Sequence, residues 1–204
     1  MKFISTIAVF VIFTLVSCKK PKIERIETNN SSDSLTYQPK VPGSKWTYNQ
    51  YAAGGLRNRD YLFTRRTEDS LYRSKTFNLY DSELDGLQLL RQEGNKYYQV
   101  LTASTNKPEL LVLDADKNIG ESWIGGVNGS DTYTYSITQK IPIYTLDGFT
   151  FKNIIVVHQI RTNTAGETTL SVDSYYARGI GLVKSEGSIS GVGVTVKLLV
   201  LDLR

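Results

Sequence analysis

The chain has 204 residues, a formal net charge of +4, and only one cysteine, one histidine and one methionine. These single counts exclude an intramolecular disulfide framework, a cysteine-based zinc site and a multi-histidine metal centre. The length suits one domain, and the small charge, with no basic cluster, excludes nucleic acid as a partner. The 13 tyrosines favour β structure.

The chain begins with a short basic start and a mainly apolar run over residues 3–16. This run is too short for a comfortable membrane span and predicts a secretory signal peptide over residues 1–17. Leu15-Val16-Ser17-Cys18 resembles the bacterial lipobox. The resemblance implies cleavage after Ser17, a diacylglyceryl group on the Cys18 sulfur and a fatty acyl group such as palmitate on the new amine. Several acyl chains would anchor the protein permanently in a membrane. An ordinary signal peptide with an incidental cysteine is the alternative.

Residues 18–40 are polar and lack an apolar period, which predicts a lipidated flexible tether ahead of a β-sheet domain over residues 41–204. Lys19, Lys20 and Lys22 would lie beside anionic headgroups. Lysine rather than aspartate after the cysteine does not resemble an inner-membrane retention signal, and there is no acidic run for surface display. We therefore expect the outer membrane, with the domain facing the periplasm.

From residue 45 onward the sequence predicts strands separated by tight turns. Thr132–Lys140 alternates apolar and hydroxyl side chains with a period of two, and dipeptides such as Asp85-Gly86 and Asp147-Gly148 are typical of hairpins. Ser82–Leu90 is the one plausible short helix. The expected strands span residues 45–51, 61–66, 70–79, 86–92, 97–103, 109–114, 132–140, 153–161, 168–177 and 192–203. The fold class is therefore all-β: one domain of about ten or eleven mostly antiparallel strands in a curved sheet or half-barrel.

Two motifs carry a resemblance across most of residues 40–190. The GxxWxY motif begins at Gly43, and the YYAxGxGLVK motif spans Tyr175 to Lys184; the stretches 119–123 and 147–153 extend the match. Together they resemble a group of uncharacterised Gram-negative envelope lipoproteins. That group is similar in layout to periplasmic lipid- and lipoprotein-handling proteins with a curved antiparallel half-barrel. The resemblance implies a fold and a location, and it supplies no catalytic residues.

No motif for metal, nucleophilic or cofactor chemistry is complete. Residues 114–120 resemble a calcium loop at its first oxygen positions, but Ile119 replaces the required glycine and Gly125 the bidentate glutamate, so a polar turn is favoured. His158 formally allows a Ser/His/Asp triad. No serine lies in a G-x-S-x-G setting, so a surface histidine is favoured. We expect no cofactor and no metal.

Two clusters of acids leave open an alternative function, an envelope glycan hydrolase that uses paired carboxylates. The clusters are Asp81, Glu83 and Asp85, and Asp114, Asp116 and Glu121. Acids grouped on a turn are more often solvated, and sequence spacing does not show whether two of them face each other.

The aromatic residues of the strands carry the remaining functional signal. Tyrosine and tryptophan are enriched where proteins bind lipids, glycans or other proteins, although filling the core accounts for most of them. The twelve candidates for a concave face are Trp46, Tyr48, Tyr51, Tyr61, Phe63, Tyr97, Tyr98, Trp123, Tyr133, Tyr135, Tyr175 and Tyr176. The ligand face is expected at Trp46, Tyr48, Trp123, Tyr133, Tyr135 and Tyr176. We expect a non-enzymatic protein, attached to the membrane through Cys18, that binds an apolar ligand or an envelope protein. A structural subunit of an envelope complex is a further alternative.

Overall fold

The computed structural model describes residues 36–52, 57–100 and 107–203, and these ranges hold twelve β-strands and no helix. Thus no helix of the kind that could cross a membrane occurs in the described part of the chain. The strands are β1 (Lys45–Ala52), β2 (Arg57–Tyr72), β3 (Lys75–Ser82), β4 (Gly86–Glu93), β5 (Lys96–Val100), β6 (Leu110–Asp114), β7 (Ser122–Asn128), β8 (Asp131–Leu146), β9 (Phe149–Thr162), β10 (Thr168–Ala177), β11 (Gly181–Ile189) and β12 (Val192–Asp202).

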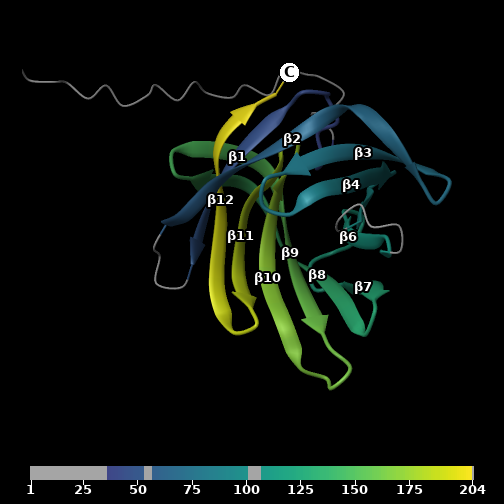
Figure 1. Cartoon of the computed structure of the whole chain (residues 1–204). Helices are drawn as coiled ribbons and strands as arrows, with labels where there is room; N and C mark the ends of the chain where they lie inside the picture. Colours follow the sequence, from purple (N-terminus) through teal and green to yellow (C-terminus); the bar gives the residue numbers. More distant parts are fainter. Residues whose placement is uncertain (1–35, 53–56, 101–106, 204) are drawn as a thin grey trace, which may run out of the picture.

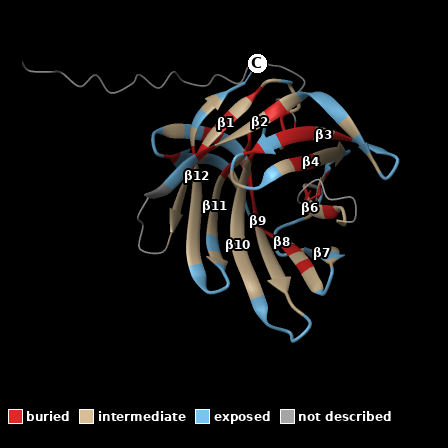
Figure 2. Ribbon diagram, in the orientation of Figure 1, coloured by how far each residue is buried: buried red, intermediate tan, exposed pale blue. Residues whose placement is uncertain are grey.

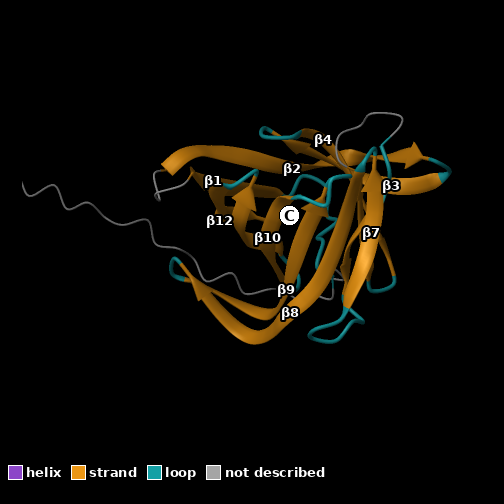
Figure 3. Ribbon diagram, turned by 90° about the horizontal axis from the view of Figure 1, so that it is seen from below, coloured by secondary structure: helices purple, strands orange, loops and turns teal. Residues whose placement is uncertain are grey.

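The strands form one antiparallel sheet whose order follows the chain. Consecutive strands pair from β1 through β6 and again from β7 through β12, β12 pairs with β1, and β6 does not pair with β7. The first and last strands therefore meet in the middle of the sheet, while β6 and β7 stand at its two edges. Figures 1 and 3 show the sheet curving strongly, so that β2 and β8 lie on opposite sides of an interior.

The two edge strands approach each other along a line that we call the seam. The indole Nε1 of Trp123 on β7 donates a hydrogen bond of 2.8 Å to the carbonyl oxygen of Leu111 on β6. Gly125 brings the β7 backbone so near that an added Cβ would lie 2.7 Å from the same oxygen and 2.2 Å from Cε2 of Tyr135. The sheet thus nearly closes on itself through side-chain contacts at this line rather than through a backbone ladder.

The core divides into clusters that bridge opposite sides of the curve. The largest joins Trp46 and Tyr80 on β1 and β3 to Ile154 and Val156 on β9. A second cluster packs Tyr133, Tyr135 and Ile137 on β8 against Leu113 on β6, across the seam, and a small third cluster lies on β3–β5. Figure 2 shows buried segments on β2, β3 and β9.

The long β8–β9 hairpin extends beyond its neighbour β10 and bends back. At its tip Asp147 and Gly148 have positive φ angles of 48° and 91°, which a tight turn requires. The ring of Tyr144 stacks on that of Tyr175 with centroids 5.3 Å apart, and an oxygen of Asp147 lies 3.5 Å from Nζ of Lys197 on β12. The tip is therefore held against the outer surface of β10–β12.

The all-β class and the curved sheet are confirmed, and the structure corrects several details. There are twelve strands among the described residues, because β7 and β11 were not expected. The helix expected over Ser82–Leu90 is wrong: the Ser82 hydroxyl accepts backbone hydrogen bonds from Leu84 and Asp85, which makes a turn, and β4 follows. The strand expected over 70–79 is interrupted by a turn at Arg73 and Ser74, both with positive φ.

Candidate functional site

Residues 36–39, which we call the N-terminal strap, are packed against the sheet. The carbonyl oxygen of Thr36 accepts a hydrogen bond of 2.6 Å from the amide of Gly179, and the amide of Tyr37 donates one of 3.1 Å to the hydroxyl of Tyr97. Thr36 and Gln38 are buried. Residues 36–39, which were expected to belong to the tether, therefore contact the sheet through their backbone groups. The expected signal peptide, Cys18 and the rest of the expected tether up to residue 35 lie outside the described residues.

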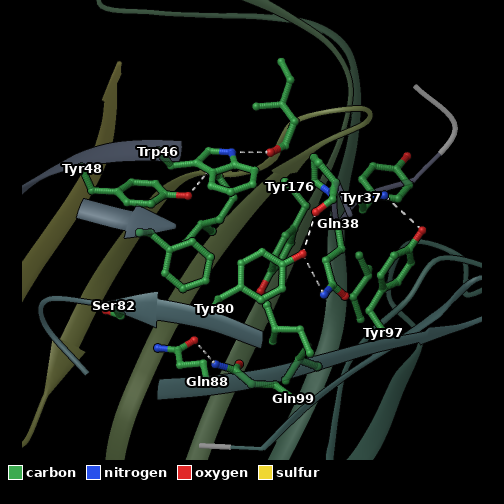
Figure 4. Close-up of a pocket in the computed structure, with 18 of the residues that line it drawn as sticks. Tyr37, Gln38, Trp46, Tyr48, Tyr80, Ser82, Gln88, Tyr97, Gln99 and Tyr176 are labelled. Carbon is green, nitrogen blue, oxygen red and sulfur yellow. Dashed lines mark hydrogen bonds between the residues drawn. The ribbon is translucent and has the colours of Figure 1, made fainter. Parts of the chain in front are cut away.

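The strap and the sheet enclose a cavity of about 210 Å³ (Figure 4). Its walls come from β1–β6, from the β10–β11 region and from the strap, so residues far apart in sequence meet there. Aromatic side chains dominate the lining. They are Tyr37, Trp46, Tyr48, Tyr61, Phe63, Tyr80, Tyr97, Tyr98 and Tyr176.

Several of these aromatic residues have their polar atoms bound to backbone carbonyls. Trp46 Nε1 donates to the oxygen of Ile180 at 2.8 Å, the Tyr48 hydroxyl donates to Leu182 at 2.9 Å, and the Tyr80 hydroxyl donates to Pro39 at 2.6 Å. Only 2% of Trp46 and 1% of Tyr80 is exposed, so these rings form a fixed floor. The partly exposed lining residues, which include Phe63, Leu90 and Tyr176, provide the accessible apolar surface.

The aromatic rings that line the cavity also stack on one another. Phe63 stacks on Tyr80 with centroids 5.0 Å apart, and Tyr48 stacks on Tyr61 at 5.4 Å. Burial is the main reason that the pKa of Tyr48 is well above its ordinary value. Burial likewise raises the pKa of Tyr176 to about 12. Both phenols are therefore protonated and uncharged at physiological pH.

One end of the cavity is polar, and we call it the polar end: Ser82, Asp85, Gln88 and Gln99. Gln99 Nε2 donates to Gln88 Oε1 at 2.9 Å, and Gln88 Nε2 donates to Asp85 Oδ2 at 3.3 Å. Figure 4 shows Ser82, Gln88 and Gln99 together on this side. Water reaches Asp85, yet protein atoms crowd its carboxyl, and this desolvation raises its pKa; Arg59 and hydrogen bonds from Ser82 and Gln88 oppose the rise.

The structure brings together three of the six residues expected at the ligand face. Trp46, Tyr48 and Tyr176 line the cavity. Tyr133 and Tyr135 instead belong to the cluster at the seam, where Trp123 stacks on Tyr135 with centroids 5.8 Å apart. Alternation along a strand identifies the inward face but not the position along the curve, so the sequence could not separate these two groups.

Sequence reasoning missed Tyr37, Tyr80 and three of the residues at the polar end, Ser82, Gln88 and Gln99; it named Asp85 only as a candidate for paired carboxylates. Tyr37 was assigned to the tether, and Tyr80 lies where the strand expected over 70–79 had already ended. A signal was available for Tyr80: it follows Phe77 and Leu79 in an aromatic and apolar run. For Gln88 and Gln99 there was none, because only the pairing of β4 with β5 makes them neighbours.

The two acid clusters are dispersed by the fold. Asp81 forms an ion pair with Arg66 Nε at 2.6 Å, and a Glu83 oxygen accepts the Leu62 amide at 2.7 Å. Asp114 ends β6 and Asp116 lies in the turn that follows, where its amide donates to Asp114 Oδ1. Of the acids in the two clusters, Asp85 alone is among the described residues that line the cavity. The described residues include no group of three or more metal-ligating side chains.

His158 lies on β9 with its Nδ1 2.8 Å from an Asp173 oxygen on β10. Ser136 on β8 is opposite His158 in the strand register, so three residues of the triad types form a row across the sheet. None of them lines the cavity. The row therefore offers no enclosed position for a substrate at the described site.

No protein-family model matches this chain, and no curated protein matches its sequence. Among solved structures, a Bacteroides fragilis protein described as exported and as having a YmcC-like fold shares 13% identity at a TM-score of 0.53, covering 83% of this chain and 100% of that one. A Parabacteroides distasonis protein described as a lipoprotein shares 12% identity at a TM-score of 0.49, with coverages of 82% and 99%. At this identity the first likeness shows the fold: an all-β curved sheet.

Proposed function

We propose that the protein is a lipid-anchored envelope protein that binds an apolar ligand in the aromatic cavity and performs no catalysis. The observation that carries the binding role is the cavity itself, with its nine aromatic walls and its largely buried floor. Aromatic side chains in a preformed concavity favour ligands with a large apolar surface. Support for the envelope location comes from the lipobox-like residues before Cys18 and from the fold shared with a protein described as exported.

Binding can be tested on the chain from residue 18 onward, expressed without its signal so that no lipid is attached. This chain contains every residue that the structure describes. We expect N-phenyl-1-naphthylamine to bind with enhanced fluorescence, and native mass spectrometry of protein extracted from membranes to show a bound lipid. Val112 on β6 lines the cavity, and Val112→Phe should weaken probe binding at least tenfold by filling it. Val127→Phe, at an exposed position on β7, is the matched control. Absence of probe binding by the unaltered chain would overturn the proposal.

The anchor is tested separately in cells. We expect Cys18→Ala to prevent incorporation of labelled palmitate, because the sulfur that starts the lipidation is gone. Ser17→Ala, a small-for-small replacement at the residue before the cysteine, should retain the label. Palmitate incorporation by the Cys18→Ala protein would contradict the anchoring role while leaving the cavity proposal intact.

A further inference from the structure

Charge is distributed unevenly around the cavity. Asp85 contributes the one carboxylate among the described lining residues, and these residues include no lysine, arginine or histidine. The charge of Asp85 also helps to raise the pKa of Tyr61, after burial as the main cause, so its effect extends into the aromatic wall. The guanidinium of Arg59 acts on Asp85 from outside the lining. The polar end is therefore negative, with its nearest opposing charge outside the cavity.

The hydrogen bonds at this end have a fixed direction. A carboxylate can only accept, so the Gln88 amide must donate its N–H to Asp85 and present its oxygen to Gln99. The N–H donors of these two hydrogen bonds therefore point toward Asp85. The Asp85 carboxylate can accept further hydrogen bonds, so it suits a ligand group that donates them.

The aromatic floor has the same electrostatic preference. The donors of Trp46, Tyr48 and Tyr80 are bound to backbone carbonyls and are not available to a ligand. A ligand beside these side chains would therefore meet aromatic carbon rather than hydrogen-bond donors, and aromatic rings attract cations rather than anions. The polar end and the aromatic floor both disfavour an anionic ligand, because the described lining residues include no cation that would compensate its negative charge.

We infer that the ligand is an amphiphile with an amine or ammonium head group, its head at Asp85 and its apolar body against the partly exposed Phe63, Leu90 and Tyr176. This inference rests on the proposed function and specifies the ligand class for the same cavity. Fatty acids and lipids with an exposed anionic head are excluded as preferred ligands, because they would place a negative charge beside the Asp85 carboxylate.

The test compares three molecules that share a decyl chain: decyltrimethylammonium, decanol and decanoate. Each displaces N-phenyl-1-naphthylamine from the chain starting at residue 18, below its micelle concentration and at pH 7. We expect the cation to bind at least tenfold more tightly than decanoate, with the alcohol between them. Asp85→Asn should reduce this ratio to about threefold or less. Asp116→Asn, which removes the same charge from a residue outside the cavity lining, should leave it unchanged.

The outcomes separate the two proposals. If the probe binds and all three decyl compounds displace it equally, or decanoate binds most tightly, the head-group inference is wrong and the apolar binding role stands. If the probe itself does not bind, the proposed function fails. Should Asp85→Asn lose its folded far-UV spectrum, salt titration of the unaltered chain decides: the cation preference must fall as ionic strength rises. A preference that does not change with salt would overturn the role of Asp85.

Discussion

Tyrosine has two structural roles in this molecule, and Tyr80 combines both. Its ring stacks on Phe63 in the floor of the cavity, while its hydroxyl donates to the Pro39 carbonyl of the N-terminal strap and accepts from Gln38 at 3.4 Å. A phenylalanine could fill the floor but could not hold the strap. The tyrosine content that indicated β structure in the sequence is therefore also a means of attaching irregular backbone to a sheet.

Replacing Tyr80 by phenylalanine tests this second role. Tyr80→Phe keeps the ring and leaves the buried Pro39 carbonyl without its hydroxyl donor, so we expect a loss of about 1–2 kcal/mol in the free energy of unfolding. Urea unfolding followed by tryptophan fluorescence gives the value. Tyr98→Phe is the control, because the contacts of Tyr98 with Lys75 and Arg91 are made by its ring, which phenylalanine retains. Equal stabilities of the two variants would show that the strap does not depend on this bond.

The acids at the end of β3 show that regular spacing in sequence does not by itself bring side chains together. One residue separates Asp81 from Glu83 and Glu83 from Asp85, and the sequence left open whether two of these acids act together. A shared face requires a continuing strand, but β3 ends at Ser82 and a turn follows. Each acid therefore faces a different environment, and Asp85 alone reaches the cavity.

At the level of elements, β7 is the least conventional strand. It pairs with β8 on one side and meets β6 at the seam on the other, with a register shift between Ile124 and Gly126. Its sequence, with two glycines and two exposed apolar residues, lacks the alternation that identifies strands. The glycines are explained by the close approach of β6, a tertiary contact that no local pattern encodes.

Gly125→Ala is the sharpest test of the seam. The added Cβ would overlap the Tyr135 ring and the Leu111 carbonyl oxygen, so β7 must move away from β6. We expect a destabilisation of about 2 kcal/mol, within the range for overpacked sites. Val127→Ala on the same strand, at an exposed position, should change stability by less than about 0.5 kcal/mol. Thermal unfolding monitored by circular dichroism compares them, and a Gly125→Ala protein as stable as the control would mean that the seam is open in solution.

The sequence predicted elements well where strand and turn chemistry coincide. The strand over 168–177 was predicted at its observed bounds, and Gly86, Gly94, Gly129 and Gly148 adopt the positive φ expected of hairpin glycines. The sequence did not predict the ends of strands whose length depends on pairing with another strand. β8 and β9 extend well beyond their apolar runs because each provides the other's hydrogen bonds along the hairpin. Three of the six residues expected at the ligand face line the cavity, and the other three lie at the seam.

For the whole molecule, the buried tyrosines determine the response to alkali. Burial, as the main cause, raises the pKa values of Tyr48, Tyr61 and Tyr135 above their ordinary value and raises that of Tyr176 to about 12. An unfolded tyrosine ionises near pH 10. Because the folded pKa values are the higher ones, their contribution to stability is complete below pH ~10 and is lost as the pH rises toward the folded values.

We therefore expect tyrosinate absorbance at 295 nm to rise in two steps. The partly exposed tyrosines should ionise first, with the far-UV circular dichroism unchanged, and the buried ones only together with loss of the β-sheet signal at higher pH. A guanidinium-denatured sample, with all 13 tyrosines accessible, gives the single-step reference. One smooth ionisation near pH 10 in the folded protein would contradict the burial of these side chains.

The pairing of β1 with β12 has a consequence for the order of folding. During synthesis β1 can pair with β2 at once, but its other edge must wait until residues 194–202 exist, since these are its partners. Contacts this distant in sequence close late and slow the folding of β proteins. Until then a free strand edge is available to other chains, which is a known route to aggregation. The last strand made is thus the one that protects the first, and a chain released before Val192 would retain an exposed edge at its centre.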